Sequence, residues 1–214
     1  MYRKLIPWTT LAVLAVGVLM LTACYGEGVH GRPRESLDIG DKAPCWGNLP
    51  ATDGESYSMA DFDAPLLVVA FACHHCPAVV AYEERMIQLQ ADYADKGVQL
   101  VAINPNTIYP LSRMKDRVEE KGYNFPYLMD ETKESGHQYG ATHTPHMFVL
   151  DADRVVRYKG GIDDSTNPAN VKVHCLRNAL DALLEGNDPP VTVTRPRGCT
   201  VKYGNVDNYR ARFK

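Results

Sequence analysis

Long apolar runs are scarce in this sequence, and their scarcity limits the classes of protein to which it can belong. The longest run, residues 11–21, is shorter than the about 20 apolar residues that a membrane-spanning helix needs. It follows Arg3 and Lys4 and fits the hydrophobic part of a secretory signal peptide. The sequence also lacks internal repeats and low-complexity tracts, so a repeat architecture is not expected.

Positive charge is also in short supply. Without Arg3 and Lys4 the chain would carry 21 Lys and Arg against 26 Asp and Glu, a net charge of −5. No stripe of basic side chains interrupts this acidic balance, and such stripes are typical of nucleic-acid-binding proteins. We therefore expect no nucleic-acid partner.

The end of the N-terminal apolar run carries a distinctive tetrapeptide. Leu21-Thr22-Ala23-Cys24 resembles the lipobox of bacterial lipoproteins. The resemblance implies that residues 1–23 are a lipoprotein signal peptide and that Cys24 is the lipidation site. An ordinary cleavage site beside a chance cysteine is the alternative. The expected location is the bacterial cell envelope, with the exported chain anchored to the membrane by lipid and facing the periplasm or the exterior.

The mature chain is predicted to form one domain with two extensions. Cleavage after residue 23 would leave 191 of the 214 residues, which suits a single domain with a sizeable core. Residues 24–36 are rich in Gly and poor in apolar side chains, and they predict a flexible tether. The globular domain is expected over residues 37–188, followed by a C-terminal tail over residues 189–214.

Apolar runs predict the strands of this domain. Continuous runs at 66–72 and 98–103 are typical of strands that are buried on both faces. Two further runs, at 146–150 and 154–158, flank a short turn, and this arrangement predicts an antiparallel hairpin.

Helical spacing of apolar residues predicts three helices between these strands and after them. They cover residues 77–96, about 111–122 and about 170–185, with Val173 on the buried face of the last. The order β-α-β-α-β-β-α indicates an α/β fold with a central mixed sheet flanked by helices.

The most informative motif is Cys73-His74-His75-Cys76, directly after the first buried strand and before the first helix. Two thiols separated by two residues can close a small disulfide ring. The start of a helix lowers the pKa of a cysteine from about 8.5 toward roughly 3.5–7.5. Because the thiolate is the form that attacks disulfides, the motif predicts a redox-active dithiol.

Two other interpretations of the motif are weaker. A zinc site usually has a second ligand pair with similar spacing, and no second Cys-x-x-Cys or His-x-His pair follows. A purely structural disulfide over so short a loop would constrain the unfolded chain little. We therefore expect neither a bound metal nor a cofactor.

The whole pattern resembles the thioredoxin superfamily. Thr144-Pro145 directly precedes the strand expected at 146, as in that family. Segments 71–77, 121–128 and 140–145, with the tail at 198–202, are similar to the redoxin branch of alkyl hydroperoxide reductases and thiol-specific antioxidants. A thioredoxin-like fold is implied.

The resemblance also implies a function and its residues. Cys73 would be the exposed nucleophile and Cys76 the resolving thiol, with Pro145 in the cis form against them. The backbone at Thr144 would pair with a substrate chain, and His143 would contact substrate or tune the thiolate. This predicts a thiol–disulfide oxidoreductase that acts on exported proteins and exchanges electrons with an upstream donor or acceptor.

The two histidines inside the motif are predicted to tune the thiolate. His74 or His75, as a donor or a cation, would stabilise the reduced form and make the couple more oxidising than the thioredoxin value of about −270 mV. The alternative is that both are solvated residues at the helix start. Glu83 and Glu84 are expected to face solvent.

Other functions remain open. A thiol-dependent peroxidase is one alternative, although Ala70 stands where peroxiredoxins carry a threonine. A redox-inactive binding module is another. A copper-binding protein is a third, with ligands drawn from Cys73, Cys76, His74, His75 and His143.

Three cysteines lie outside the motif and the lipobox. Cys45, Cys175 and Cys199 allow at most one disulfide and leave one thiol over. The sequence does not assign the pairing.

Overall fold

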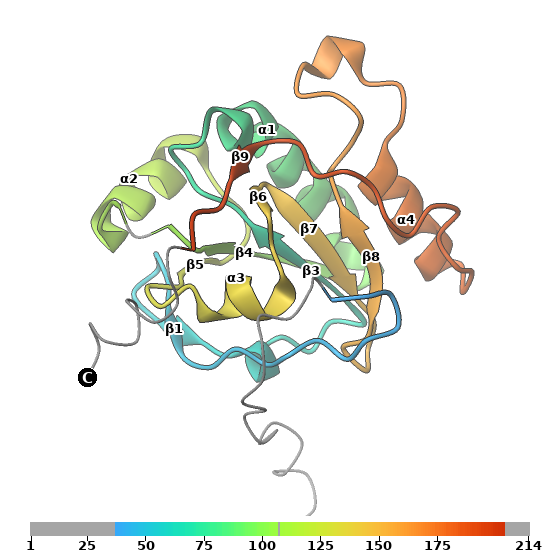
Figure 1. Cartoon of the computed structure of the whole chain (residues 1–214), viewed down its shortest axis with the longest axis horizontal. Helices are drawn as coiled ribbons and strands as arrows, with labels where there is room; N and C mark the ends of the chain where they lie inside the picture. Colours follow the sequence, from blue (N-terminus) through green and yellow to red (C-terminus); the bar gives the residue numbers. More distant parts are fainter. Residues whose placement is uncertain (1–36, 107, 204–214) are drawn as a thin grey trace, which may run out of the picture. The chain divides into compact units, whose positions relative to one another are not determined.

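A computed structural model describes residues 37–106 and 108–203 (Figure 1). The predicted signal peptide, the lipidation site Cys24 and the tether lie outside the described residues, as does the end of the tail from residue 204. Within the described ranges, no helix combines the length and apolar character that crossing a bilayer requires.

A five-stranded mixed sheet forms the centre of the domain (Figure 1). Its order is β5-β4-β3-β7-β8; β3 runs parallel to β4 and antiparallel to β7. The strands are β3 Leu66–Phe71, β4 Val98–Asn104, β5 Tyr127–Met129, β7 His146–Leu150 and β8 Val156–Gly160. The predicted α/β fold with a mixed sheet is confirmed, and β7 and β8 form the expected hairpin.

Among the described residues, four helices accompany the sheet and four short strands lie outside it. The helices are α1 Pro77–Tyr93, α2 Leu111–Lys121, α3 Glu134–Tyr139 and α4 Cys175–Leu184. The short strands are β1 Leu49–Pro50, β2 Ser56–Tyr57, β6 His143–Thr144 and β9 Cys199–Thr200. β1 pairs with β2, and β6 pairs with β9.

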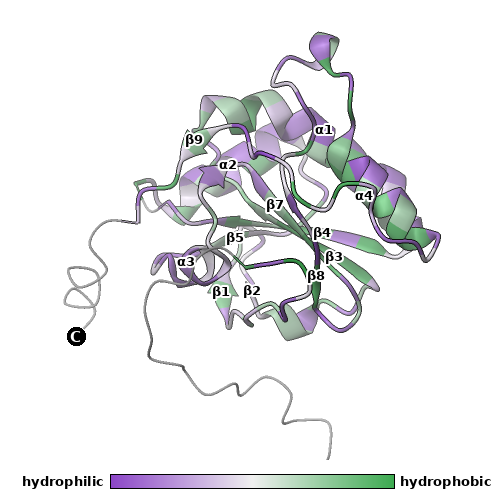
Figure 2. Cartoon of the chain, turned by 45° about the vertical axis from the view of Figure 1, so that its right-hand side comes forward, coloured by the Kyte–Doolittle hydropathy of each residue, from purple (hydrophilic) through white to green (hydrophobic). Residues whose placement is uncertain are grey.

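Both faces of the central strand β3 are buried, because its side chains alternate between two apolar clusters. Val68 and Ala70 pack with residues of α1, α2 and α4, whereas Val69 and Phe71 pack with α3 and the segment that precedes β3. Hydrophobic residues are therefore concentrated in the central strands, and α1 and α4 show both kinds of residue (Figure 2).

The helix after the dithiol motif begins and ends where its sequence predicts. Pro77 takes the first helical position, where its missing N–H costs nothing. A 3-10 turn, Ala94–Lys96, follows Tyr93, and Gly97 then adopts a left-handed φ of 83° that stops the helix. This end directs the chain into β4.

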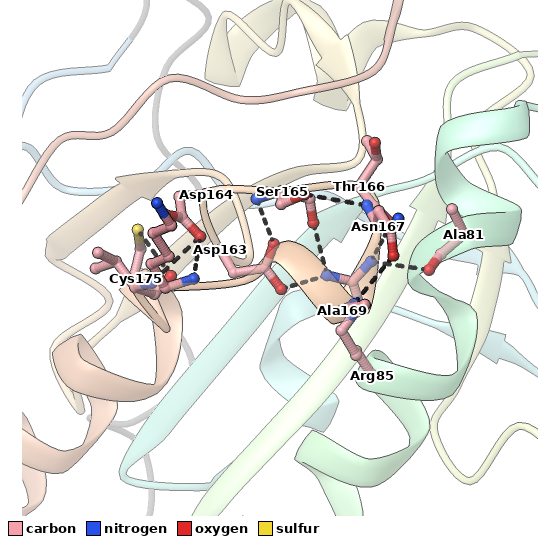
Figure 3. Close-up of polar contacts among 11 residues, drawn as sticks. Ala81, Arg85, Asp163, Asp164, Ser165, Thr166, Asn167, Ala169 and Cys175 are labelled. Carbon is pink, nitrogen blue, oxygen red and sulfur yellow. Dashed lines mark hydrogen bonds and ion pairs between the residues drawn. The ribbon is translucent and has the colours of Figure 1, made fainter.

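The last helix is shorter than predicted. It begins at Cys175, and Pro168–Asn170 form a separate 3-10 turn. Val173 precedes the helix and is 47% exposed, so its predicted burial is wrong. The reason is a loop in which the Asp164 carboxylate accepts hydrogen bonds from the N–H groups of Lys172 and Val173 (Figure 3).

Arg85 of α1 holds the same loop from the other side (Figure 3). Its guanidinium pairs with the buried Asp163 carboxylate and donates to the carbonyl groups of Ser165 and Thr166, each at 2.8 Å. Because these backbone groups of the loop bond to side chains, they are not available for helical hydrogen bonds. This explains why α4 starts later than predicted.

Candidate active site

The Cys73–Cys76 turn joins the end of β3 to the start of α1, as predicted. The Cys76 N–H donates to the Cys73 carbonyl at 2.9 Å and closes the turn. The Tyr127 hydroxyl connects the turn to β5: it donates to the Ala72 carbonyl and accepts from the His74 N–H, both at 3.0 Å. Three elements therefore hold the motif in place.

The Thr144-Pro145 peptide bond is cis, and it lies beside the turn. The Cys76 thiol lies 3.3 Å from the Thr144 carbonyl oxygen, to which it can donate. The structure thus brings Cys76, Thr144 and Pro145 together across 68 residues of sequence. The proximity expected from the resemblance is present.

Cys73 is not the exposed thiolate that the sequence predicted. It is 2% exposed. Burial, which disfavours the charged form, raises the pKa of Cys73 to about 12, even though the backbone N–H of His75 favours the thiolate. The prediction of a low pKa at Cys73 is therefore wrong. The helix begins four residues later, at Pro77, and its Val79 N–H faces the sulfur of Cys76.

The His75 ring lies beside the Cys73 sulfur, with its Nδ1 and Nε2 3.0 and 3.1 Å away. Burial lowers the pKa of His75. It also lowers the pKa of His74, with a further contribution from the His75 charge. Both rings are therefore neutral at pH 7, and the predicted cationic role is wrong. A neutral ring beside a thiol can still accept its proton.

His74 occupies a different position from His75. Its ring packs edge-on against His75 and Tyr109, with centroids 5.2 and 5.7 Å apart. Its Nδ1 is buried and has no hydrogen-bond partner among the described residues. His74, His75 and Tyr109 line a shallow depression that α2 completes with Arg113, Asp116 and Arg117.

The Cys76 sulfur has a third cysteine beside it. The sulfur of Cys199, on β9, lies 2.6 Å from the sulfur of Cys76. Burial opposes ionisation of Cys76, but hydrogen bonding by Cys199 and by the Val79 N–H lowers its pKa overall. The hydrogen bond with Cys76 raises the pKa of Cys199. The Cys199 thiol, with help from the Val79 N–H, therefore favours the thiolate at Cys76 rather than at Cys73.

Glu83 does not face solvent, so this prediction is wrong. It is 4% exposed and forms a two-contact ion pair with Arg117 of α2, at 2.8 and 2.6 Å, while the Tyr123 hydroxyl donates to it at 2.6 Å. The neighbouring helix α2 and the segment after it supply these partners, and the sequence of α1 alone does not reveal them. Glu84 is exposed, as expected.

His143 lies on β6, opposite Thr200. In the part of the chain that the structure describes, its ring makes its hydrogen bond with Thr142, at 2.9 Å, and not with either sulfur of the motif. The buried His146, which follows Pro145, was missed from the sequence. Its Nδ1 accepts from the Thr142 N–H at 3.2 Å, and burial lowers its pKa to about 3.

No group of three or more His, Cys, Asp or Glu side chains among the described residues is arranged to hold a metal ion. The ligands considered for copper are therefore not assembled into a site there. Tyr127, whose hydroxyl supports the turn, is also absent from the site residues that the sequence predicted. In the sequence, Tyr127 stands out only as an aromatic residue within segment 121–128, which resembles the redoxin branch.

Comparison with known proteins agrees with the family resemblance of the sequence over most of the domain. The model of the AhpC/TSA family matches residues 39–159. A solved structure of a hypothetical protein, SMc02350, from Sinorhizobium meliloti is 36% identical, covers 80% of this chain and 97% of its own, and has a TM-score of 0.73. A conserved protein of Geobacillus kaustophilus is 38% identical over 78% of this chain and 93% of its own, with a TM-score of 0.73.

Two curated relatives carry functional names. A protein of Mycobacterium tuberculosis, named as a candidate peroxiredoxin, is 27% identical over 60% of this chain and 80% of its own. The thiol-disulfide oxidoreductase ResA of Bacillus thuringiensis is 25% identical over 64% of this chain and 80% of its own.

Proposed function

The chain belongs to the AhpC/TSA family, and on this premise we propose that it is a thiol–disulfide oxidoreductase whose Cys73 and Cys76 act on exported proteins. One observation carries the proposal. Two cysteines share a turn at the end of the central strand, and the carbonyl before a cis-proline lies 3.3 Å from the second sulfur. Among the relatives, ResA bears the name of this activity.

The proposed exchange starts at Cys73. Its thiol is protonated at neutral pH, so the neutral His75 ring, 3.0 Å away, accepts the proton as the sulfur attacks. The substrate disulfide breaks, one substrate sulfur leaves as a thiol, and a mixed disulfide joins the other to Cys73. Cys76 then attacks Cys73, which releases the second substrate thiol and leaves a Cys73–Cys76 disulfide. An upstream thiol donor restores the dithiol.

Peroxide reduction is the second candidate, because the family and one relative carry that name. The surroundings of the sulfur favour it less. Ala70, three residues before Cys73, is fully buried in β3 and packs in the apolar cluster with α1. It offers no hydroxyl group to bind a peroxide.

The location is part of the proposal. The support is the sequence alone: a basic start, an 11-residue apolar run and the lipobox-like Leu21-Thr22-Ala23-Cys24. We expect the full chain to fractionate with membranes when it is expressed in a bacterium, and Cys24→Ser to move it to the soluble fraction. Cys45→Ser is the matched control. Equal distribution of all three proteins would contradict the anchor.

The activity test is reduction of insulin with dithiothreitol as electron donor. Cys73→Ser should lower the rate at least 100-fold, since the attacking sulfur is gone, and Cys175→Ser should change it less than twofold. A Cys73→Ser protein that retains activity would contradict the proposal. Thiol-dependent consumption of hydrogen peroxide, measured on the same proteins, decides between the two candidates: faster peroxide turnover than insulin turnover would favour the peroxidase.

A further inference from the structure

The C-terminal segment of residues 192–203, here called the strap, crosses the candidate active site. In Figure 1 it is the red segment that runs from the α4 side of the molecule to β9 beside β6. It starts on the edge of β8, where the Thr194 N–H donates to the Lys159 carbonyl at 3.0 Å. It continues along β6, where the Val201 N–H donates to the Thr142 carbonyl at 2.9 Å.

The strap is closely fitted to the backbone before the cis-proline. Cys199 pairs with Thr144 in antiparallel register, and a Cβ at Gly198 would lie 1.9 Å from the Thr144 carbonyl oxygen. Only glycine allows this approach. Beyond Cys199, the Tyr203 hydroxyl donates to the Ala141 carbonyl. The edge of β6 next to Cys76 is thus already paired with the chain's own strand.

This pairing brings three sulfurs into one cluster with unequal access to solvent. Cys73 and Cys76 are 2% and 3% exposed, whereas Cys199 is exposed. The sulfurs of Cys76 and Cys199 lie 2.6 Å apart. A partner protein therefore meets Cys199 first, and Cys199 already touches the buried pair.

We propose that Cys199 is a third redox cysteine, which forms a disulfide with Cys76 and carries electrons between the buried dithiol and an exposed thiol of a partner protein. This inference rests on the proposed function, because it describes how the Cys73–Cys76 disulfide is reduced. The partner is defined by its chemistry, a protein dithiol.

The exchange balances in two steps. First, Cys199 loses its proton to solvent and attacks Cys76; the Cys76–Cys199 bond forms, the Cys73–Cys76 bond breaks, and Cys73 takes up a proton. Second, a partner thiolate attacks the exposed Cys199 sulfur and Cys76 leaves as a thiolate. The second partner thiol then releases Cys199, so the partner ends as a disulfide and this protein as three thiols.

The first turn of α1 fits the second step, because the Val79 N–H acts to lower the pKa of Cys76. A thiol of lowered pKa is the better leaving group. The N–H groups of Val79 and Ala78 face the sulfurs of Cys76 and Cys199 respectively, so the negative charge of the step develops at the start of a helix.

The first test needs neither Cys73 nor a substrate. Cys73→Ser protein is incubated with oxidised glutathione, free thiols are blocked with N-ethylmaleimide, and disulfides are mapped by mass spectrometry. Most molecules should contain the Cys76–Cys199 disulfide. Recovery of both cysteines as maleimide adducts or as separate glutathione adducts would overturn the inference.

Gly198→Ala in the same Cys73→Ser background tests the docking of the strap without changing a sulfur. It should slow formation of the disulfide at least tenfold, while Gly47→Ala, where a Cβ meets nothing within 4 Å, should change it less than twofold. Equal rates in the two variants would contradict the role of the strap.

The second test measures reduction of the oxidised full chain by reduced thioredoxin. Cys199→Ser should slow it at least tenfold, and Cys175→Ser should not change it; unchanged reduction of Cys199→Ser would overturn the electron-carrying role. If Cys76–Cys199 forms but insulin is not reduced by the otherwise unaltered protein, the proposed function fails and the disulfide stands. If insulin is reduced at the full rate by Cys199→Ser with thioredoxin as donor, only the inference fails.

Discussion

The turn that carries the dithiol and the strap that carries Cys199 meet at the same sulfur but are held by different forces. The turn lies between two buried elements, and the Tyr127 hydroxyl ties it to the core. The strap has mostly exposed or half-buried side chains and is held by backbone hydrogen bonds, by side-chain hydrogen bonds of Thr194 and Tyr203, and by close contacts at Gly160 and Gly198. The comparison indicates that the strap can be released while the turn stays folded.

The largest difference between the two regions should appear in how much a substitution in each lowers the free energy of unfolding. Glu83→Gln would remove the buried one of the two carboxylates that pair with Arg117, which is 18% exposed and would keep only the exposed Glu120, at 2.9 Å. We expect the free energy of unfolding to fall by about 3 kcal/mol. In the strap, Tyr203→Phe removes one hydrogen bond to Ala141 and should cost about 1 kcal/mol or less. Urea unfolding of both variants measures this; equal losses would contradict the comparison.

Removal of the Tyr127 hydroxyl, which supports the turn, should have the next largest effect on the free energy of unfolding. Tyr127→Phe leaves the Ala72 carbonyl and the His74 N–H without their shared partner. An unsatisfied buried polar group costs about 1–3 kcal/mol, so we expect a loss of about 2 kcal/mol in thermal or urea unfolding. The same variant should alter the rate at which Cys73 reacts with iodoacetamide. An unchanged rate and stability would show that the hydroxyl does not hold the turn.

Burial of Cys73 should make the reduced protein less stable at high pH. Its pKa is about 8.5 in the unfolded chain and is raised to about 12 in the folded one, so between these values only the unfolded state loses the proton. The stabilising contribution of the buried thiol is complete below pH 8.5 and declines as the pH rises toward 12.

Comparison with Cys73→Ser isolates this effect from tyrosines that titrate in the same range. The melting temperature of the reduced, otherwise unaltered protein should fall more steeply between pH 8 and about 10.5 than that of Cys73→Ser. Parallel curves would mean that Cys73 ionises as easily in the folded state as in the unfolded one.

The smallest expected effect concerns the reduction potential of the Cys73–Cys76 couple, which should lie close to that of thioredoxin. The sequence predicted a couple more oxidising than thioredoxin, because a stabilised Cys73 thiolate would favour the reduced form. The buried thiol and neutral histidines remove that reason. In Cys199→Ser, where only the turn can form the disulfide, we now expect a potential at or below about −270 mV by equilibration with a dithiothreitol buffer. A value above about −200 mV would restore the original prediction.

Features with a local signal were predictable. The apolar run of β3, the dithiol turn and Pro77 follow one another in sequence, and the structure keeps that order. Thr144-Pro145 was recognisable because proline marks the start of the next strand. Helix periodicity placed α1 within a turn of its observed end.

Features that depend on distant partners were not predictable. Glu83 is buried because Arg117 and Tyr123 come from another helix and the segment after it. The pKa of Cys73 depends on how deeply the whole fold covers it. Cys199 meets Cys76 across 123 residues, whereas the sequence suggested for Cys199 only a disulfide with Cys45 or Cys175, or a free thiol.

The most direct test of the account is to trap the intermediate with insulin. In the Cys76→Ser/Cys199→Ser protein nothing nearby can resolve a mixed disulfide at Cys73, so mass spectrometry after acid quenching should find an insulin chain bonded to Cys73. An adduct absent from Cys73, or found instead at Cys45 or Cys175, would contradict the claim that exchange begins at this sulfur.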